Sequence, residues 1–167
     1  GTTDVTRTIC FSKPKKSIKD IFTKVLQGHI AVATADLKRN FNGELIDILA
    51  RKSLKKSGLN YDHGTGHGVG FFLNVHEGPQ AISKYNKVPI RKGMILSNEP
   101  GYYLNNNYGI RIENLIYVDS LKGNLFFKNF TLSPIDLDMI NFKLLSMKER
   151  DYLFNYHLDV YSKISKY

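Results

Sequence analysis

Features that would assign the chain to a specialised class of protein are scarce. Among its 167 residues there is one cysteine, Cys10, which excludes an internal disulfide and fits a reducing compartment. We expect Cys10 to fill space in a strand as a small apolar residue. No apolar run approaches the ~18 residues of a membrane-spanning helix, and internal repeats, low-complexity tracts and Gly-Ser linkers are missing. The sequence therefore predicts one globular domain over residues 1–167 that does not cross a membrane.

Acidic residues are few relative to basic ones. The 24 Lys and Arg against 15 Asp and Glu give a formal net charge of +9 at pH 7, which could attract nucleic acid or an anionic membrane surface. The lysines are dispersed, however, and no RNA-binding, zinc-finger or helix-turn-helix pattern accompanies them. We therefore expect a solvated basic surface and no nucleic-acid or membrane partner. A nucleic-acid-binding module is the alternative, and steep salt dependence of binding would reveal it.

Apolar periodicity predicts both helices and strands. Strands are expected over residues 2–11, 94–98, 110–118 and 125–132, the last two forming a hairpin at Gly123-Asn124. A first helix is expected to begin with a capping pair, Ser17 and Asp20. Its apolar stripe is Ile18, Ile21, Phe22, Val25, Leu26 and Ile30. His29 lies at the edge of this stripe and is interpreted as a packing or surface residue.

Two further helices follow from the same patterns. One runs from about Gly43 to Ser57, ends at Gly58, and buries Leu45, Ile48, Leu49 and Leu54. The other begins at a capping box of Ser146 and Glu149. Its predicted stripe is Leu153, Phe154, His157, Leu158, Tyr161 and Ile164, with His157 as a structural residue.

Three of the five histidines stand in one glycine-rich stretch, YDHGTGHGVGFFLNVHEGP, residues 61–79. Alternating glycines make it a poor helix, so His63 and His67 do not share a helix face as the histidines of a helical zinc motif do. An extended chain with close backbone approach is the better interpretation, with both histidines on one side and bare glycines leaving room for a ligand. A loop with solvent-facing histidines is the alternative.

Two later stretches, GMILSNEPGYY and YGIRIEN, each place a carboxylate within an apolar strand pattern. In the first, Glu99 ends the strand and Pro100-Gly101 is predicted to form a turn. In the second, aliphatic and charged side chains alternate, so that one face carries Ile110 and Ile112 and the other carries Arg111 and Glu113. Taken singly, each glutamate is most simply the solvated face of a half-buried strand.

Together these stretches resemble a known family. TTDVTR near the start, HGTGHGVGFFLNVHEGP, GMILSNEPGYY and GIRIEN match, in order and spacing, the pita-bread metallopeptidases, and among them aminopeptidase P of the eukaryotic cytosolic type. The resemblance extends to SPIDLDMIN and ERDYLFNYH near the end. It implies an α+β fold, the C-terminal part of a pita-bread domain, with a curved antiparallel sheet flanked by helices.

The resemblance also implies roles for individual residues. Asp4 and Glu113 match carboxylates that bridge two divalent metals, and His67 and Glu99 match further ligands of one metal. His63 and His76 match histidines that line the substrate pocket, His76 being a proton shuttle that also stabilises the intermediate. Glu99 is expected to handle the proton of the attacking water. Tyr103 and Arg111 match two residues that support the site by hydrogen bonding.

One expected ligand is not in the chain. The family has a further metal-binding aspartate upstream of the position of Asp4, and this sequence begins three residues before Asp4. We therefore expect a C-terminal fragment of the catalytic domain, with the upstream part of the same polypeptide as its partner.

The resemblance implies the activity and its cofactors. The expected enzyme releases the N-terminal residue from peptides with proline in second position, through a hydroxide that bridges two metal ions. Carboxylates with one imidazole and no thiolates favour Mn²⁺. A cytoplasmic homodimer is expected from the relatives. The alternatives are a prolidase-type Xaa-Pro dipeptidase and a catalytically inactive pita-bread module that binds peptides or proteins.

Overall fold

The computed structural model describes residues 4–72 and 74–165 of the chain. Within these ranges, three α-helices and seven strands surround two apolar clusters. The helices are α1 (Lys16–Ala33), α2 (Gly43–Lys55) and α3 (Met147–Ile164). The strands are β1 (Gly66–Val69), β2 (Ala81–Ile82), β3 (Ile95–Asn98), β4 (Gly101–Leu104), β5 (Tyr108–Arg111), β6 (Asn114–Leu121) and β7 (Asn124–Asn129). None of the helices in these ranges is long and apolar enough to cross a membrane.

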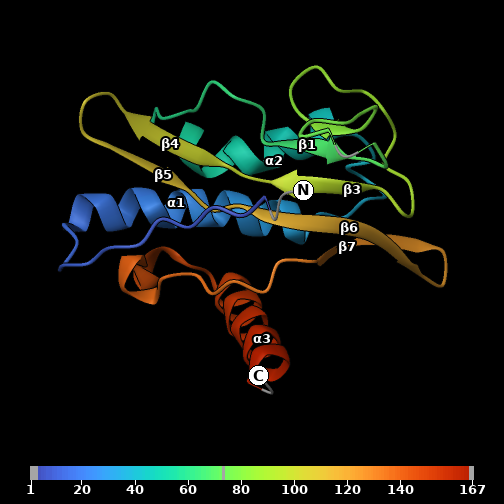
Figure 1. Ribbon diagram of the computed structural model, residues 1–167. Helices are drawn as coiled ribbons and strands as arrows, with labels where there is room; N and C mark the ends of the chain where they lie inside the picture. Colours follow the sequence, from blue (N-terminus) through green and yellow to red (C-terminus); the bar gives the residue numbers. More distant parts are fainter. Residues whose placement is uncertain (1–3, 73, 166–167) are drawn as a thin grey trace.

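Five of the strands form one antiparallel sheet in the order β2-β1-β3-β6-β7, and β4 and β5 form a separate antiparallel pair (Figure 1). The sheet is curled, and helices accompany it. The hairpin predicted at Gly123-Asn124 is present as β6 and β7, with a left-handed turn at Lys122 and Gly123. The α+β class predicted from the sequence is confirmed.

The β3–β6 and β4–β5 pairs continue one another in a single register. Asn98 pairs with Asn114, and Gly101 pairs with Arg111, so the residue numbers of each pair sum to the same value. The turn predicted at Pro100-Gly101 is therefore wrong, because Gly101 opens a strand. The strand predicted over 110–118 is interrupted, since Pro100 has no N–H to complete the ladder. The same register places Glu99 opposite Glu113.

The strand predicted over residues 2–11 does not form over its described part, residues 4–11. Thr6 makes an isolated bridge to Glu113, whose N–H donates to the Thr6 carbonyl at 3.0 Å. At the next pairing position, the Thr8 hydroxyl accepts from the Arg111 N–H at 3.0 Å and donates to the Arg111 carbonyl at 3.2 Å. A side chain thus replaces the backbone at this point, which ends the ladder. Residues 2 and 3 lie outside the described ranges.

Helix α1 has the predicted stripe but not the predicted cap. Phe22, Val25, Leu26 and Ile30 are buried and pack with Ile110 and Ile112 in one apolar cluster, against which Ile18 and Ile21 also pack. The helix begins at Lys16, with Lys15 at the N-cap position and no side-chain cap. Ser17 is therefore already inside the helix. Asp20 is engaged elsewhere, because it accepts hydrogen bonds from Lys16 and Asn141.

The stripe predicted for helix α2 is only partly correct, since Leu54 is fully buried and Leu49 packs against the core, whereas Ile48 does not. Ile46, Ala50 and Leu54 are fully buried, whereas Ile48 is 56% exposed and Leu45 and Leu49 are half-buried. The reason is an ion pair on the buried face, between Asp47 and Arg51, which an apolar pattern treats as surface. The Asn42 side chain caps the helix, and Gly58 takes the predicted left-handed conformation after it.

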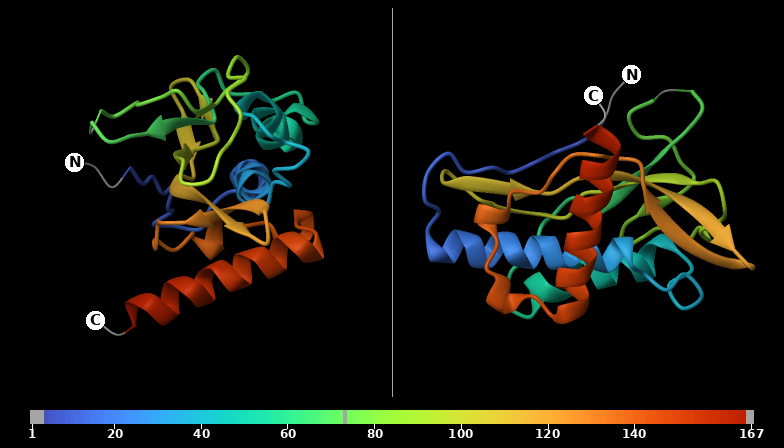
Figure 2. Two further views of the ribbon diagram at one scale, coloured as in Figure 1. Left: turned by 90° about the vertical axis from the view of Figure 1, so that its right-hand side faces the viewer. Right: turned by 90° about the horizontal axis from the view of Figure 1, so that it is seen from below.

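Helix α3 begins at the predicted capping box, since Ser146 and Glu149 bond reciprocally. It lies apart from the other helices, across one side of the molecule (Figure 2). Its buried residues are Leu153, Tyr156 and Val160. The predicted stripe is wrong in four of its members, because Phe154, Leu158, Tyr161 and Ile164 are exposed. His157 is structural as predicted: its Nε2 accepts from the Ile135 N–H at 3.0 Å.

Candidate metal centre

The glycine-rich stretch places His67 on β1, between β2 and β3. The predicted close backbone approach is confirmed, because a Cβ at Gly66 would lie 2.0 Å from the Ser97 carbonyl oxygen and one at Gly68 would lie 2.3 Å from that of Glu77. A side chain at Gly66 or Gly68 would meet neighbouring backbone, and Gly64 and Gly66 also line a cavity, where the bare glycines leave room as expected. His63 precedes β1 in a bend, so the two histidines do not share a strand face.

Asp4, His67 and Glu113 converge from three distant parts of the sequence. One ligand atom of each lies within 4.8 Å of the others. His67 Nε2 is 3.1 Å from Asp4 Oδ2 and 3.6 Å from Glu99 Oε1, so Glu99 borders this group. The structure therefore brings together all four residues that the resemblance implied as ligands.

Hydrogen bonds orient the imidazole of His67. Its Nδ1 lies 3.0 Å from the Gly68 carbonyl oxygen, which can only accept, so Nδ1 carries the proton. The lone pair of Nε2 is then directed at the carboxylates. Ser97 links the backbone to this arrangement, because its hydroxyl accepts from the His67 N–H at 2.8 Å and donates to Glu99 Oε1 at 2.9 Å. Such contacts are the usual supports of metal-binding side chains.

Three carboxylates share the small space around Nε2. Burial raises the pKa of Glu113, the neighbouring charges of Glu99 and Asp4 raise it further, and a hydrogen bond from the Thr6 hydroxyl opposes them. Glu99 and Glu113 also face each other across the ladder, where like charges destabilise a sheet. A bound dication would relieve both effects, and three carboxylates with one imidazole are a suitable donor set for it. The residues present therefore fit a divalent metal.

The guanidinium of Arg7 fixes the segment of Asp4 and Thr6 against Glu113. Its Nη1 donates to the carbonyls of Thr6 (2.8 Å) and Glu113 (2.7 Å), and its Nη2 donates to Asn114 Oδ1 (2.7 Å). Nη2 also reaches the hydroxyl of Tyr156 on α3 at 3.0 Å. Sequence reasoning assigned no role to Arg7, although it is the last residue of TTDVTR, because its partners other than Thr6 are more than 100 residues away.

A second set of side chains lies next to the candidate metal-ligand group of Asp4, His67 and Glu113. Arg111 Nε donates to the Tyr103 hydroxyl at 2.8 Å, and the same hydroxyl lies 3.0 Å from His63 Nε2. His63 Nδ1 faces the Gly64 carbonyl at 2.7 Å, so Nε2 is the acceptor of the Tyr103 proton. Burial lowers the pKa of His63, which keeps its ring neutral at neutral pH. Arg111 also contacts Glu99 at 3.6 Å.

These groups line one cavity of about 400 Å³. Its walls are formed by His63, Gly64, Gly66, His67, His76, Glu99 and Arg111. The ring centroids of His67 and His76 are 4.3 Å apart, and His76 is exposed to solvent. The imidazoles of His63 and His76 and the guanidinium of Arg111 thus face the same space as His67 and Glu99. This arrangement suits an anionic or polar reacting group.

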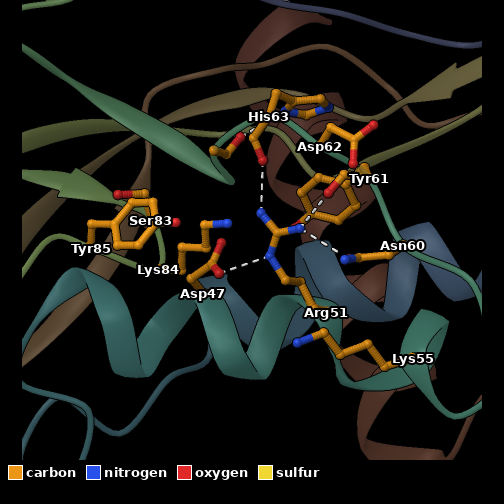
Figure 3. Close-up of a pocket in the computed structure, with 11 residues that line it drawn as sticks. Asp47, Arg51, Lys55, Asn60, Tyr61, Asp62, His63, Ser83, Lys84 and Tyr85 are labelled. Carbon is orange, nitrogen blue, oxygen red and sulfur yellow. Dashed lines mark hydrogen bonds and ion pairs between the residues drawn. The ribbon is translucent and has the colours of Figure 1, made fainter.

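Behind His63, the ion pair of α2 organises a second pocket (Figure 3). Arg51 Nε donates to Asp47 Oδ2 at 2.7 Å. Its Nη1 and Nη2 donate to the carbonyls of Tyr61 (2.6 Å) and His63 (2.7 Å), and its guanidinium lies 3.9 Å above the Tyr61 ring. Arg51 therefore fixes the backbone that carries His63. Sequence reasoning missed this pair, although its i, i+4 spacing on a helix was a usable signal.

Comparison with known proteins places these observations in a family. Residues 1–120 match the metallopeptidase family M24, and residues 123–167 match the C-terminal region of peptidase M24. The chain is 51% identical to aminopeptidase P2 of Arabidopsis thaliana and 48% identical to a probable Xaa-Pro aminopeptidase P of Coprinopsis cinerea, in each case over 99% of its length. Over 99% of its length, the chain superimposes on an X-prolyl aminopeptidase of Caenorhabditis elegans with a TM-score of 0.91 and 40% identity. That protein is described as a cytosolic enzyme with a di-nuclear active site.

The matched relatives are much longer proteins. The chain spans 25% of the Arabidopsis protein, 28% of the Coprinopsis protein and 28% of the Caenorhabditis structure. The match covers most of the chain nevertheless, including each residue of the metal-ligand group. By sequence and by fold, this chain belongs to metallopeptidase family M24.

Proposed function

We propose that the chain is part of a metal-dependent aminopeptidase that releases the N-terminal residue from peptides with proline in second position. The observation that carries this proposal is the convergence of Asp4, His67 and Glu113 within 4.8 Å, beside a cavity that His63 and His76 line. The names of the two curated relatives and of the structural neighbour support the same activity.

In this proposal Asp4, His67, Glu99 and Glu113 would hold divalent metal, Asp4 and Glu113 having the role of ligands common to both ions that the resemblance implies. The di-nuclear site of the Caenorhabditis enzyme supports two ions. The upstream part of the longer polypeptide would contribute the remaining aspartate. Hard oxygen donors with a single imidazole favour Mn²⁺. When bound, a pair of such ions supplies a hydroxide nucleophile near neutral pH and polarises the scissile carbonyl.

The residues of this chain then do three things. Glu99, fixed by Ser97, accepts the proton of the attacking water. His76, exposed at the cavity, donates a proton to the leaving prolyl nitrogen and hydrogen-bonds the oxyanion. His63, kept neutral by burial and fixed by Tyr103 and the Arg51-bound backbone, lines the substrate pocket.

The activity is tested on the full-length polypeptide that contains this chain, loaded with Mn²⁺. We expect hydrolysis of Xaa-Pro-Xaa peptides and release of the first residue. Hydrolysis of Xaa-Pro dipeptides alone would show a prolidase, and no hydrolysis with metal bound would show an inactive binding module. Assignment to a cytosolic homodimer belongs to the same proposal and is tested by cell fractionation and by light scattering.

Single variants test the assigned roles. His76→Ala is expected to lower kcat by about 10²- to 10⁴-fold with metal content unchanged, because it removes acid and base help only. His67→Ala is expected to empty the site. His157→Gln, a histidine outside the cavity, serves as the matched control and should keep both metal and turnover. Normal metal content in His67→Ala, or metal loss in His76→Ala, would contradict the assignment.

A further inference from the structure

His29 presents a buried imidazole on α1 that makes no ordinary hydrogen bond. The side chain is fully buried, and neither ring nitrogen has a hydrogen-bond partner of good geometry among the described residues. A buried polar group without a partner is rare and destabilising, so such a ring requires an explanation. Its surroundings provide one.

The ladder beside the metal-ligand group lacks one backbone donor. The Ile112 N–H donates to the Pro100 carbonyl at 3.4 Å. In an antiparallel ladder such a pair exchanges two hydrogen bonds, and the return bond needs an N–H at residue 100. Proline has none. Ile112 is fully buried, and within residues 4–72 and 74–165 no other backbone or side-chain donor bonds to its carbonyl.

The unpaired ring lies where this donor is missing. The backbones of Ile112 and Asn98 are close enough to the His29 ring to raise its pKa against the effect of burial. The Asn98 side chain also donates to the His29 carbonyl at 2.9 Å, which fixes α1 against the ladder. Asn98 faces Asn114 in the ladder, where its own carbonyl has a backbone partner by the alternation of the register. Of these two backbone carbonyls, that of Ile112 is therefore the free acceptor; the side-chain oxygen of Asn98 is a further buried acceptor without a partner among the described residues.

We propose that His29 is a positioning residue for the metal centre, whose ring N–H takes the place of the donor that Pro100 lacks and so fixes Glu113 opposite Glu99. The metal-binding role of these glutamates rests on the proposed function. Burial lowers the pKa of His29 to about 3, so the ring is neutral at neutral pH and has one N–H to donate.

The location explains why this bond matters. Ile112 directly precedes Glu113, and Pro100 directly follows Glu99. In the ladder, the pair of Pro100 and Ile112 therefore flanks the pair of Glu99 and Glu113 on one side, and the pair of Asn98 and Asn114 flanks it on the other. With a single bond of 3.4 Å at this pair, the two strands could separate, and the carboxylates with them.

Metal affinity measures the effect. The dissociation constant for Mn²⁺ is determined by calorimetry for the wild-type chain, His29→Phe, His29→Asn, Pro100→Ala and the double variant His29→Phe with Pro100→Ala. Loss of an outer support typically weakens metal binding about 10- to 100-fold, and we expect this for His29→Phe. His29→Asn retains an N–H and should bind more tightly than His29→Phe.

The double variant is the decisive sample, because alanine at position 100 restores the backbone N–H. We expect it to recover most of the affinity that His29→Phe loses, a strong non-additivity between the two changes. Val32→Ala, on the same helix but in the other apolar cluster, is the control for general loss of stability and should leave the Mn²⁺ affinity unchanged. A double variant as weak as His29→Phe would overturn the proposal.

A second measurement does not depend on metal. In a ¹⁵N- and ¹³C-labelled chain, the His29 ring N–H should be protected from solvent exchange and show a coupling across the hydrogen bond to the Ile112 carbonyl carbon. Absence of that coupling would overturn the inference even if Mn²⁺ binds. A wild-type chain that shows the coupling but binds no Mn²⁺ would instead contradict the proposed metal centre.

Discussion

At the scale of single residues, the buried ring of His29 makes folding sensitive to acid. Its pKa falls from 6.5 to about 3 in the folded chain, first because of burial and then because of the charge of Arg7. Between these values the unfolded chain binds the proton and the folded chain does not. Stability is therefore complete above about pH 6.5 and falls as the pH drops toward 3.

We predict that this loss disappears when the imidazole is removed. Between pH 6.5 and 4.5, the wild-type chain should lose roughly 2 to 3 kcal/mol of unfolding free energy more than His29→Asn, at about 1.4 kcal/mol per pH unit. Urea unfolding of both proteins at the two pH values measures the difference. Carboxylates titrate in both proteins and cancel, so equal pH dependence would show that folding does not lower the pKa of His29.

Residue roles divide clearly by what the sequence could reveal. Asp4, His67, Glu99 and Glu113 were named from their motifs, and the structure brings them to one place. Arg7 could not be found in this way, because its function consists of contacts with carbonyls that follow it by more than 100 residues. Arg7 is the last residue of TTDVTR, but the motif does not show which distant groups its guanidinium binds.

At the scale of elements, the buried ion pair of α2 connects the helix to the stretch that contains His63. Asp47 and Arg51 have side chains only 2% and 8% exposed, and they are 2.7 Å apart. Replacing one member leaves the other as an uncompensated buried charge. We predict that Arg51→Met destabilises the chain by about 3 to 5 kcal/mol.

The paired variant separates charge from packing. Asp47→Leu with Arg51→Met removes both charges and should cost clearly less than Arg51→Met alone, since a buried pair is often replaceable by apolar residues. Unfolding in urea gives the free energies. Arg39→Met removes an exposed pairing with Asp36 and is the control, expected within about 1 kcal/mol of wild type. Equal losses in the single and paired variants would show that hydrogen bonds to the carbonyls of residues 61 and 63, rather than the charge of Asp47, dominate.

Element boundaries were predictable where the signal is local. The capping box at Ser146 and Glu149 and the end of α2 at Gly58 need only neighbouring residues, and both are present. Buried faces were less predictable. On α3, Tyr156 is buried and its hydroxyl bonds to Arg7 and the Ser133 carbonyl, whereas the more apolar Phe154 is exposed. The choice between two aromatic faces depends on distant partners.

At the scale of the whole molecule, the candidate metal ligands Asp4, His67 and Glu113 come from three regions of the fold. Asp4 precedes the bridge to Glu113, His67 comes from β1, and Glu113 lies between β5 and β6. A metal that binds only when these regions are folded together stabilises the whole chain. The mutual repulsion of the carboxylates is removed at the same time.

We predict that Mn²⁺ raises the melting temperature of the chain and that EDTA reverses the rise. At a free concentration 100 times the dissociation constant, binding contributes about 2.7 kcal/mol, or roughly 5 to 10 °C for a chain of this size. Differential scanning fluorimetry across a Mn²⁺ series measures it. His67→Ala should show no shift, whereas His157→Gln should shift as the wild type does. An equal rise in His67→Ala would assign the effect to binding elsewhere.

The overall architecture was predictable to the level of the family. The motifs implied an antiparallel α+β fold, which the strand order and the structural neighbour bear out. The separate β4–β5 pair was not predicted, because a proline-glycine pair ordinarily indicates a turn. Here the proline interrupts hydrogen bonding without changing the direction of the chain.

The glycines of β1 and α1 have a consequence for how this sequence can diverge. A methyl group at Gly66 would lie 2.0 Å from the Ser97 carbonyl oxygen, and one at Gly28 would lie 2.3 Å from that of Ala50. Both obstacles are backbone carbonyl oxygens, which no substitution elsewhere in the sequence can remove. Even alanine, the mildest replacement, is excluded unless strands or helices move apart. Random mutagenesis with selection for folding should therefore find these two side-chain-free positions less variable than many of the large buried residues around them.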